Sequence, residues 1–201
     1  MKRSPKKRPA AATPFNLILL GDPASGKATQ AARIVKRYGM YDFDMGRELL
    51  KPAVRRSFDY GGTTARGRLT PTAVVRGILR RTIPRIPARR GILFDGHPKM
   101  IGEAKLVAKL LIENRRADPL VLYLRIPMRE TMRRAEGRMR DDDTRAALRR
   151  RARYYRTEVG KTVSFFRKRY KFEKISGVGA PDEVWKKITR AIEGRFAQGT
   201  S

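Results

Sequence analysis

The chain has 201 residues, 40% of them hydrophobic, and a formal net charge of +29, which suits one domain with a well-buried core. Its apolar runs are far shorter than the ~20 residues that a membrane-spanning helix needs, so we expect no membrane segment. Cysteine is absent, which excludes disulfides and thiolate metal sites, and the N-terminus lacks an apolar leader, so we expect a cytoplasmic protein.

The first 13 residues form a basic segment without apolar periodicity. Proline and alanine stand there among five cations, Lys2, Arg3, Lys6, Lys7 and Arg8. Low hydrophobicity combined with high charge predicts a disordered tail over residues 1–13. The charge of the whole chain would attract nucleotides and nucleic acids alike. Composition leaves open whether it serves weak nucleic-acid binding or is only solvated surface.

Residues 14–197 read as one domain in which short buried strands alternate with helices. A continuous apolar run over 15–20 predicts the first strand, which Gly21 ends, because a strand buried on both faces needs no polar alternation. The pattern over 25–37 predicts a helix that Gly39 closes.

Two further strands are expected at 91–94 and 120–126, with a helical segment between them. The composition from 128 to 170 is helical and strongly basic, and a last strand near 172–175 precedes a helix that starts at Pro181. Strands alternating with helices predict an α/β fold, a parallel sheet of about five strands covered by helices on both faces.

A phosphate-binding loop joins the first predicted strand to the first predicted helix. Gly21-Asp22-Pro23-Ala24-Ser25-Gly26-Lys27 has the two glycines and the lysine at P-loop spacing. Backbone N–H groups and the positive end of the helix dipole would wrap a phosphate, and Lys27 adds a point charge. Ala28 stands where the strict pattern has Ser or Thr, so Thr29 must supply any hydroxyl near Mg²⁺.

Several motifs, in order along most of the chain, resemble the adenylate kinase family. The loop with its displaced threonine, Gly21 to Gln30, is the first. Met45-Gly46 with Leu49-Leu50-Lys51 resembles the family's monophosphate-binding helix, and Gly67-Arg68-Leu69-Thr70-Pro71 resembles the turn after it. Asp95-Gly96-His97-Pro98-Lys99 resembles Asp-Gly-Phe-Pro-Arg. The lid cluster is matched by Gly137-Arg138, Asp141-Asp142, Arg150 and Tyr154.

The resemblance implies a P-loop NTPase-type fold that carries a monophosphate-binding helical insert at about 41–82 and a short lid at about 134–143. It also implies reversible phosphoryl transfer from ATP-Mg to a nucleoside monophosphate, with AMP as the expected acceptor, by a monomer. Such transfer depends on positioning and on Lys, Arg and Mg²⁺ charge. A long lid has no room here, and a zinc-bound lid is excluded without cysteine.

On the donor side, the resemblance assigns the ATP site and the metal. Asp95, at the end of a buried strand, would hold Mg²⁺ through water together with Thr29, although Asp is also a common helix N-cap. Arg138 and Arg140 compete for the same lid position. The residues expected to bind ATP are Gly21, Ala24, Ser25, Gly26, Lys27, Ala28, Thr29 and Arg134, and those expected to be catalytic are Lys27, Arg138, Arg140 and Arg150.

On the acceptor side, Lys51 and Lys99 stand where the family has two phosphate-gripping arginines. Lysine keeps the charge but lacks the bidentate fork, so we expect a weaker grip, which Arg47 would supplement. Glu103 replaces a base-reading glutamine, and its carboxylate suits guanine better than adenine. The expected monophosphate-binding residues are Met45, Gly46, Arg47, Lys51, Gly96, Lys99 and Glu103.

Two alternatives stay open beside this enzyme. One is a nucleoside monophosphate kinase for a base other than adenine. The other is a kinase-like ATPase associated with RNA or ribosome assembly, although the retained acceptor motifs and the lack of aromatics among the basic residues favour the kinase. His97, the single histidine, is expected to pack or to form a hydrogen bond, because an anionic acceptor needs no general base.

Overall fold

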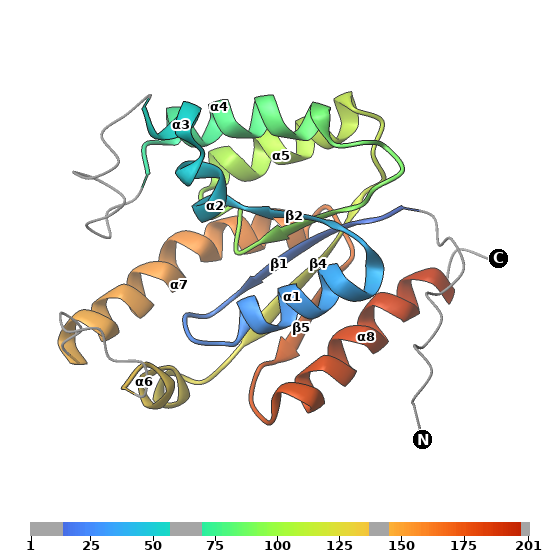
Figure 1. Cartoon of the computed structure of the whole chain (residues 1–201). Coiled ribbons are helices and arrows are strands. Elements are labelled where there is room, and N and C mark those ends of the chain that lie inside the picture. Colours follow the sequence, from blue (N-terminus) through green and yellow to red (C-terminus); the bar gives the residue numbers. More distant parts are fainter. Residues whose placement is uncertain (1–13, 57–69, 137–144, 198–201) are drawn as a thin grey trace, which may run out of the picture.

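The computed structural model describes residues 14–56, 70–136 and 145–197, and every statement on structure below refers to these ranges. Five strands form a parallel sheet in the order β2-β3-β1-β4-β5 (Figure 1), as the sequence predicted. The strands are β1 (Asn16–Gly21), β2 (Tyr41–Asp44), β3 (Ile92–Asp95), β4 (Pro119–Arg125) and β5 (Phe172–Ser176).

Helices cover both faces of the sheet (Figure 1). Helices α1 (Lys27–Tyr38) and α8 (Pro181–Ala197) pack on one face, and α4 (Thr72–Thr82), α5 (Ile101–Glu113) and α7 (Arg145–Arg167) pack on the other. The shorter elements are α2 (Met45–Leu50), α3 (Pro52–Arg55), the 3₁₀ turn η2 (Ile83–Arg85) and α6 (Met128–Glu136). Within the described ranges, no helix is both long and apolar enough to span a membrane.

Strand β1 shows why the predicted run is apolar on both faces of the strand from Leu17 onward. Successive strand side chains point to opposite faces. Leu17 and Leu19 enter the core beneath α1 and α8, whereas Ile18 and Leu20 enter the core beneath α4, α5 and α7. All four are fully buried, because β1 lies between β3 and β4 and has helices on both sides.

Strand β2 was not anticipated among the apolar runs. Its sequence Tyr41-Asp42-Phe43-Asp44 contains a single fully buried residue, Phe43. It is an edge strand, paired only with β3, so polar residues are tolerated there. The strand occupies the first four positions of the 41–82 range expected for the insert, and α2 begins directly after it.

Candidate active site

The phosphate loop spans the turn from the carboxyl end of β1 to the first turn of α1. Gly21 packs against β4 so closely that a Cβ there would lie 2.6 Å from the Leu124 carbonyl oxygen, a contact that only glycine avoids. Gly26, the residue before α1, has a left-handed φ of 87°, which glycine adopts without strain. Glycine is therefore required at Gly21 for close packing against β4 and at Gly26 for the left-handed backbone conformation.

Lys27 lies within this loop rather than in solvent. Its Nζ donates hydrogen bonds to the carbonyl oxygens of Gly21 at 2.7 Å and Asp22 at 2.9 Å, and it lies 5.6 Å from the centroid of the Tyr155 ring. Burial lowers the pKa of Lys27 to about 8, while Asp95 opposes that shift. The ammonium is thus held where an incoming phosphate would meet it.

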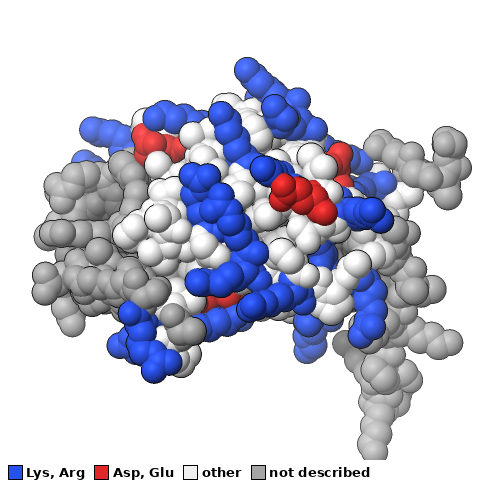
Figure 2. All heavy atoms as spheres, turned by 90° about the horizontal axis from the view of Figure 1, so that it is seen from above, with Lys and Arg blue, Asp and Glu red and all other residues white. Residues whose placement is uncertain are grey.

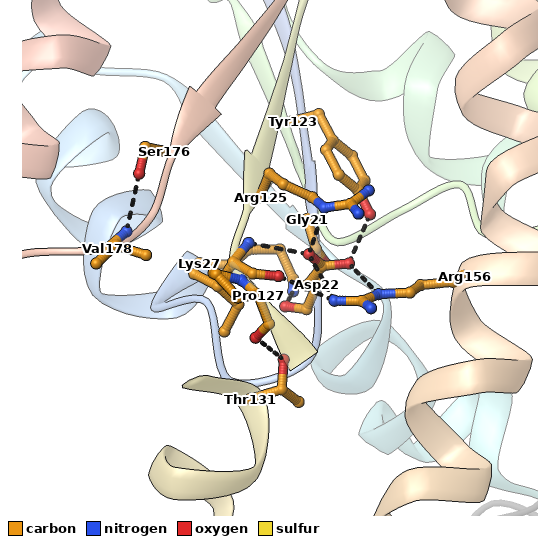
Figure 3. A network of polar contacts seen from close by, with 11 residues as sticks. Gly21, Asp22, Lys27, Tyr123, Arg125, Pro127, Thr131, Arg156, Ser176 and Val178 are labelled. Atoms are coloured by element: carbon orange, nitrogen blue, oxygen red, sulfur yellow. Dashed lines mark hydrogen bonds and ion pairs between the residues drawn. The ribbon is translucent and has the colours of Figure 1, made fainter. Parts of the chain in front are cut away.

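Asp22 is the centre of a buried polar network under the loop (Figure 3). Its carboxylate accepts hydrogen bonds from the Tyr123 hydroxyl at 2.8 Å, the Ile126 N–H at 2.9 Å and Arg156 Nε at 3.2 Å. Arg156 also donates to the Ile126 carbonyl at 2.9 Å. Arg125 Nε lies 3.6 Å from the same carboxylate. Asp22 thereby ties the loop to β4 and α7.

Asp95 ends β3, next to β1 in the sheet, and pairs in register with Leu19 and Asp44. Burial, and after it the charges of Asp44 and Asp42, raise the pKa of Asp95 to about 6, against the opposing charges of Lys27 and Arg47. A carboxylate in such an electronegative corner suits a hard divalent cation. The described residues hold no cluster of three metal-ligating side chains.

The turn after Asp95 lies against the lysine of the loop. A Cβ added to Gly96, whose φ is 62°, would lie 3.7 Å from Lys27 Cε. A cis peptide joins His97 to Pro98. His97 is 3% exposed, its ring centroid lies 5.8 Å from that of Phe43, and burial lowers its pKa to about 3. The imidazole is therefore neutral and packed.

The expected phosphate ligands on the acceptor side already have partners. Lys51 Nζ lies 2.7 Å from both oxygens of the Glu48 carboxylate. Arg47 pairs with Asp42 at 2.5 Å, and its N–H donates to Asp44 at 2.7 Å. A monophosphate would have to compete with these carboxylates. Lys99, in contrast, makes no side-chain ion pair or hydrogen bond with the described residues.

Glu103 is turned toward backbone at the start of α5. Its Oε2 accepts hydrogen bonds from the N–H groups of Lys99 at 3.1 Å and Met100 at 3.3 Å, and lies 3.7 Å from His97 Nδ1. The side chain is 6% exposed. The carboxylate therefore fixes the turn that carries Lys99. Contact with an acceptor base would have to use hydrogen-bonding positions of the carboxylate that these two N–H groups do not occupy.

On the donor side, Arg134 of α6 lies beside the loop. It donates to the carbonyl oxygens of Gly177 at 3.0 Å and Ala24 at 3.4 Å, and pairs with Glu130 at 2.5 Å. Arg138 and Arg140 lie outside the described residues, as do Asp141, Asp142, Gly67, Arg68 and Leu69. Arg150 and Tyr154 lie on α7, but their side chains are outside the described part.

Most of the sequence is similar to one known protein family. The adenylate kinase family model matches residues 19–171, about three quarters of the chain. The chain belongs to the adenylate kinase family. Among its relatives are adenylate kinases of Phenylobacterium zucineum (30% identical, 91% of this chain and 100% of the relative), Thermus thermophilus (30%, 88% and 96%) and Phocaeicola vulgatus (27%, 89% and 98%). The chain is a nucleoside monophosphate kinase, as the sequence predicted.

Three residues that sequence reasoning did not assign lie in this kinase site. Asp22 was given no role within the loop, and Tyr155 and Arg156 fell in the stretch from 128 to 170 that was predicted only to be helical and basic. An acidic residue between the motif glycines is itself a signal, since it lies where phosphates should bind and requires a nearby cation. The identity of that cation, 134 residues later, has no signature in the sequence.

Proposed function

We propose that this kinase transfers the terminal phosphoryl group of ATP-Mg to AMP in a reversible reaction that gives two ADP. The bond between the terminal phosphorus and its bridging oxygen breaks, and an AMP phosphate oxygen forms the new bond. The strongest support is the meeting of the loop lysine Lys27 with the turn 95–99, which carries Asp95 and Lys99. The relatives that this chain matches over nearly their whole length are adenylate kinases, which supports the same reaction.

The side chains act by charge and position. Gly21 and the loop N–H groups from Ala24 to Thr29, together with the Lys27 ammonium, would hold the ATP phosphates. Asp95 and Thr29 would hold Mg²⁺, which supplies charge neutralisation between the phosphates. Met45, Gly46, Arg47, Lys51, Gly96, Lys99 and Glu103 would form the acceptor site, and Arg134, Arg138, Arg140 and Arg150 the clamp on ATP. No side chain has to remove a proton, because the acceptor oxygen is already anionic.

The acceptor site would be formed by the monophosphate-binding insert at about 41–82, whose first residues form β2, and by the start of α5. The lid at about 134–143 would close over ATP from the arms α6 and α7 and exclude water. A monomeric chain, the cytoplasm and the tail over residues 1–13 remain expectations from the sequence.

A coupled assay of ADP formation tests the reaction. ATP-Mg is supplied with AMP, GMP, CMP or UMP in turn, and with no acceptor as the control. We expect transfer to AMP to be fastest and hydrolysis without an acceptor to be negligible. Faster transfer to GMP would reassign the acceptor base, and steady hydrolysis that no monophosphate increases would favour an ATPase.

Glu103 gives a prediction on base selection. In Glu103→Gln, the amide oxygen can still accept from the Lys99 and Met100 N–H groups, and the new NH₂ group can donate to N1 of adenine. We expect kcat/KM for AMP to rise, because the transition state should be stabilised by about 0.5–1.5 kcal/mol, the net value of one hydrogen bond. Glu103→Ala, which removes the capping contacts as well, is the control for lost support of the turn. A fall in AMP activity in Glu103→Gln would exclude contact with the base.

Asp95 gives a prediction on stability against pH. A carboxyl group whose pKa is raised in the folded state binds its proton more tightly there than in the unfolded chain, so stability falls as pH rises from about 4 to about 6. Asp95→Asn should remove this loss. We expect it to raise the free energy of unfolding at pH 8 by on the order of 1–3 kcal/mol and to have little effect at pH 4, while Mg²⁺-dependent activity falls. Equal effects at both pH values in urea denaturation would contradict this origin.

A further inference from the structure

A basic groove lies at the end of the sheet opposite the phosphate loop. Its volume is about 330 Å³, and its walls carry Asp118, Arg167, Lys168, Arg169, Lys171 and Arg195. It adjoins the start of β4, where Pro119 pairs with Asn16 at the start of β1. The phosphate loop follows the other end of β1, roughly 20 Å away at about 3.3 Å per strand residue. The groove is therefore separate from the kinase site.

The groove contains many more basic than acidic side chains. Two of its arginines are held by contacts with neutral groups. Arg195 donates to the Asp118 carbonyl at 2.7 Å, and the Arg169 guanidinium lies 4.8 Å from the centroid of the Phe165 ring. Neither contact neutralises the charge of the arginine. Five cations thus share a cavity with one carboxylate.

The basic surface continues along the edge of the sheet. A second cavity of about 330 Å³ between β5 and α8 is lined by Lys174, Lys187 and Arg190, with Glu173 as its acidic residue. Because β5 is the edge strand, the two cavities lie along one exposed side of the domain. A row of cations over this length suits an extended chain of phosphates better than a single nucleotide.

The first described residues of the chain lie beside the groove. The Phe15 ring packs edge-on against Phe196, with centroids 5.2 Å apart, and the Arg195 guanidinium of the groove lies 6.0 Å from the centroid of the Phe15 ring. The packing of Phe15 and Phe196 thus supports this wall of the groove.

We propose that the groove, with the row along β5 and α8, binds the phosphate backbone of single-stranded nucleic acid without reading its sequence. Lys and Arg would release counterions from the phosphates, and the half-buried Tyr170 in the groove wall offers one ring on which a base can stack. No described residue of the groove is shared with the kinase site. This second activity is therefore independent of the acceptor specificity proposed above.

The test compares two triple variants that lose the same charge. The groove variant is Arg167→Gln, Lys168→Gln and Arg169→Gln. The control variant is Arg76→Gln, Arg80→Gln and Arg81→Gln on α4, whose exposed side chains belong to the α4 and α5 face, where Lys and Arg are also abundant (Figure 2). Binding of labelled oligouridine is followed by fluorescence anisotropy over a range of salt concentrations, with the DNA strand of matching length as a second probe.

We expect the groove variant to bind oligouridine at least about tenfold more weakly and to lose about two units of the slope of log K against log salt, since each phosphate contact in a single strand contributes about 0.7. The control variant should change both quantities much less, DNA should bind like RNA, and kcat of the groove variant should match that of the parent. Equal losses in both variants would show diffuse charge attraction and overturn the groove. Displacement of RNA by ATP, or tighter binding to phosphatidylserine vesicles than to RNA, would also overturn the proposal.

Discussion

Lys27→Ala should lower kcat for phosphoryl transfer by at least ~10²- to 10³-fold, because a preorganised charge at the migrating group is worth that much in a transition state. The side chain is aimed into the loop by two carbonyl contacts at 2.7 and 2.9 Å, so its charge is positioned before any substrate arrives. The substitution removes a buried ammonium whose pKa burial has already lowered to about 8, and for that reason the fold should tolerate it.

The measurement is kcat at saturating ATP and AMP together with the midpoint of thermal unfolding. Lys36→Ala, an exposed lysine on the same helix, is the matched control and should retain parent activity. A Lys27→Ala protein that keeps more than half of the parent kcat would remove the loop lysine from the mechanism. A large drop in the unfolding midpoint would instead mean that the two carbonyl contacts stabilise the loop itself.

Strands could be predicted from the sequence where burial on both faces makes nearly every residue of the strand apolar. The runs that became β1, β3 and β4 are apolar at nearly every position because both faces of these strands are covered. The edge strand β2 escaped prediction because Asp42 and Asp44 alternate with its two aromatic residues. Those carboxylates matter to the site, since they raise the pKa of Asp95, and only the register of β2 against β3 brings them there.

Short motifs in the sequence predicted which two segments meet at the candidate site. The loop from Gly21 to Lys27 and the turn from Asp95 to Lys99 are each contained in a few consecutive residues, and the sheet brings the two segments together as expected. Lys51 and Glu103 show the limit of the same reasoning. Both positions follow the family pattern, but Lys51 forms an ion pair with Glu48, and Glu103 accepts hydrogen bonds from backbone N–H groups. These contacts depend on side-chain geometry, which cannot be predicted from the spacing of residues in the sequence.

Asp22 and Arg156 illustrate the longest-range feature that the sequence concealed. A buried carboxylate is costly unless opposite charge and hydrogen-bond donors surround it. Asp22 is fully buried and accepts from Tyr123, Ile126 and Arg156, the last contributed by α7, one of the two arms of the proposed lid. The pair thus links the floor of the phosphate loop to the helix that carries Tyr155 and Arg150.

Asp22→Ala should lower the free energy of unfolding by about 3–5 kcal/mol, because it leaves the Arg156 guanidinium half-buried without its carboxylate. Arg156→Met should also destabilise the protein, since it leaves the buried Asp22 carboxylate with only the more distant and half-exposed Arg125 as a counter-charge. In the double variant Asp22→Ala/Arg156→Met neither charge is stranded, so the loss should be smaller than the sum of the two single losses by about 1–3 kcal/mol. Urea denaturation of the parent, the two single variants and the double variant gives this coupling energy. Arg125 is the control position, because its Nε lies 3.6 Å from Asp22 while its side chain is 52% exposed. The same cycle with Arg125→Met in place of Arg156→Met should give a weak coupling energy. Additive losses for Asp22 and Arg156 would mean that the contacts of Asp22 with β4 alone support the loop.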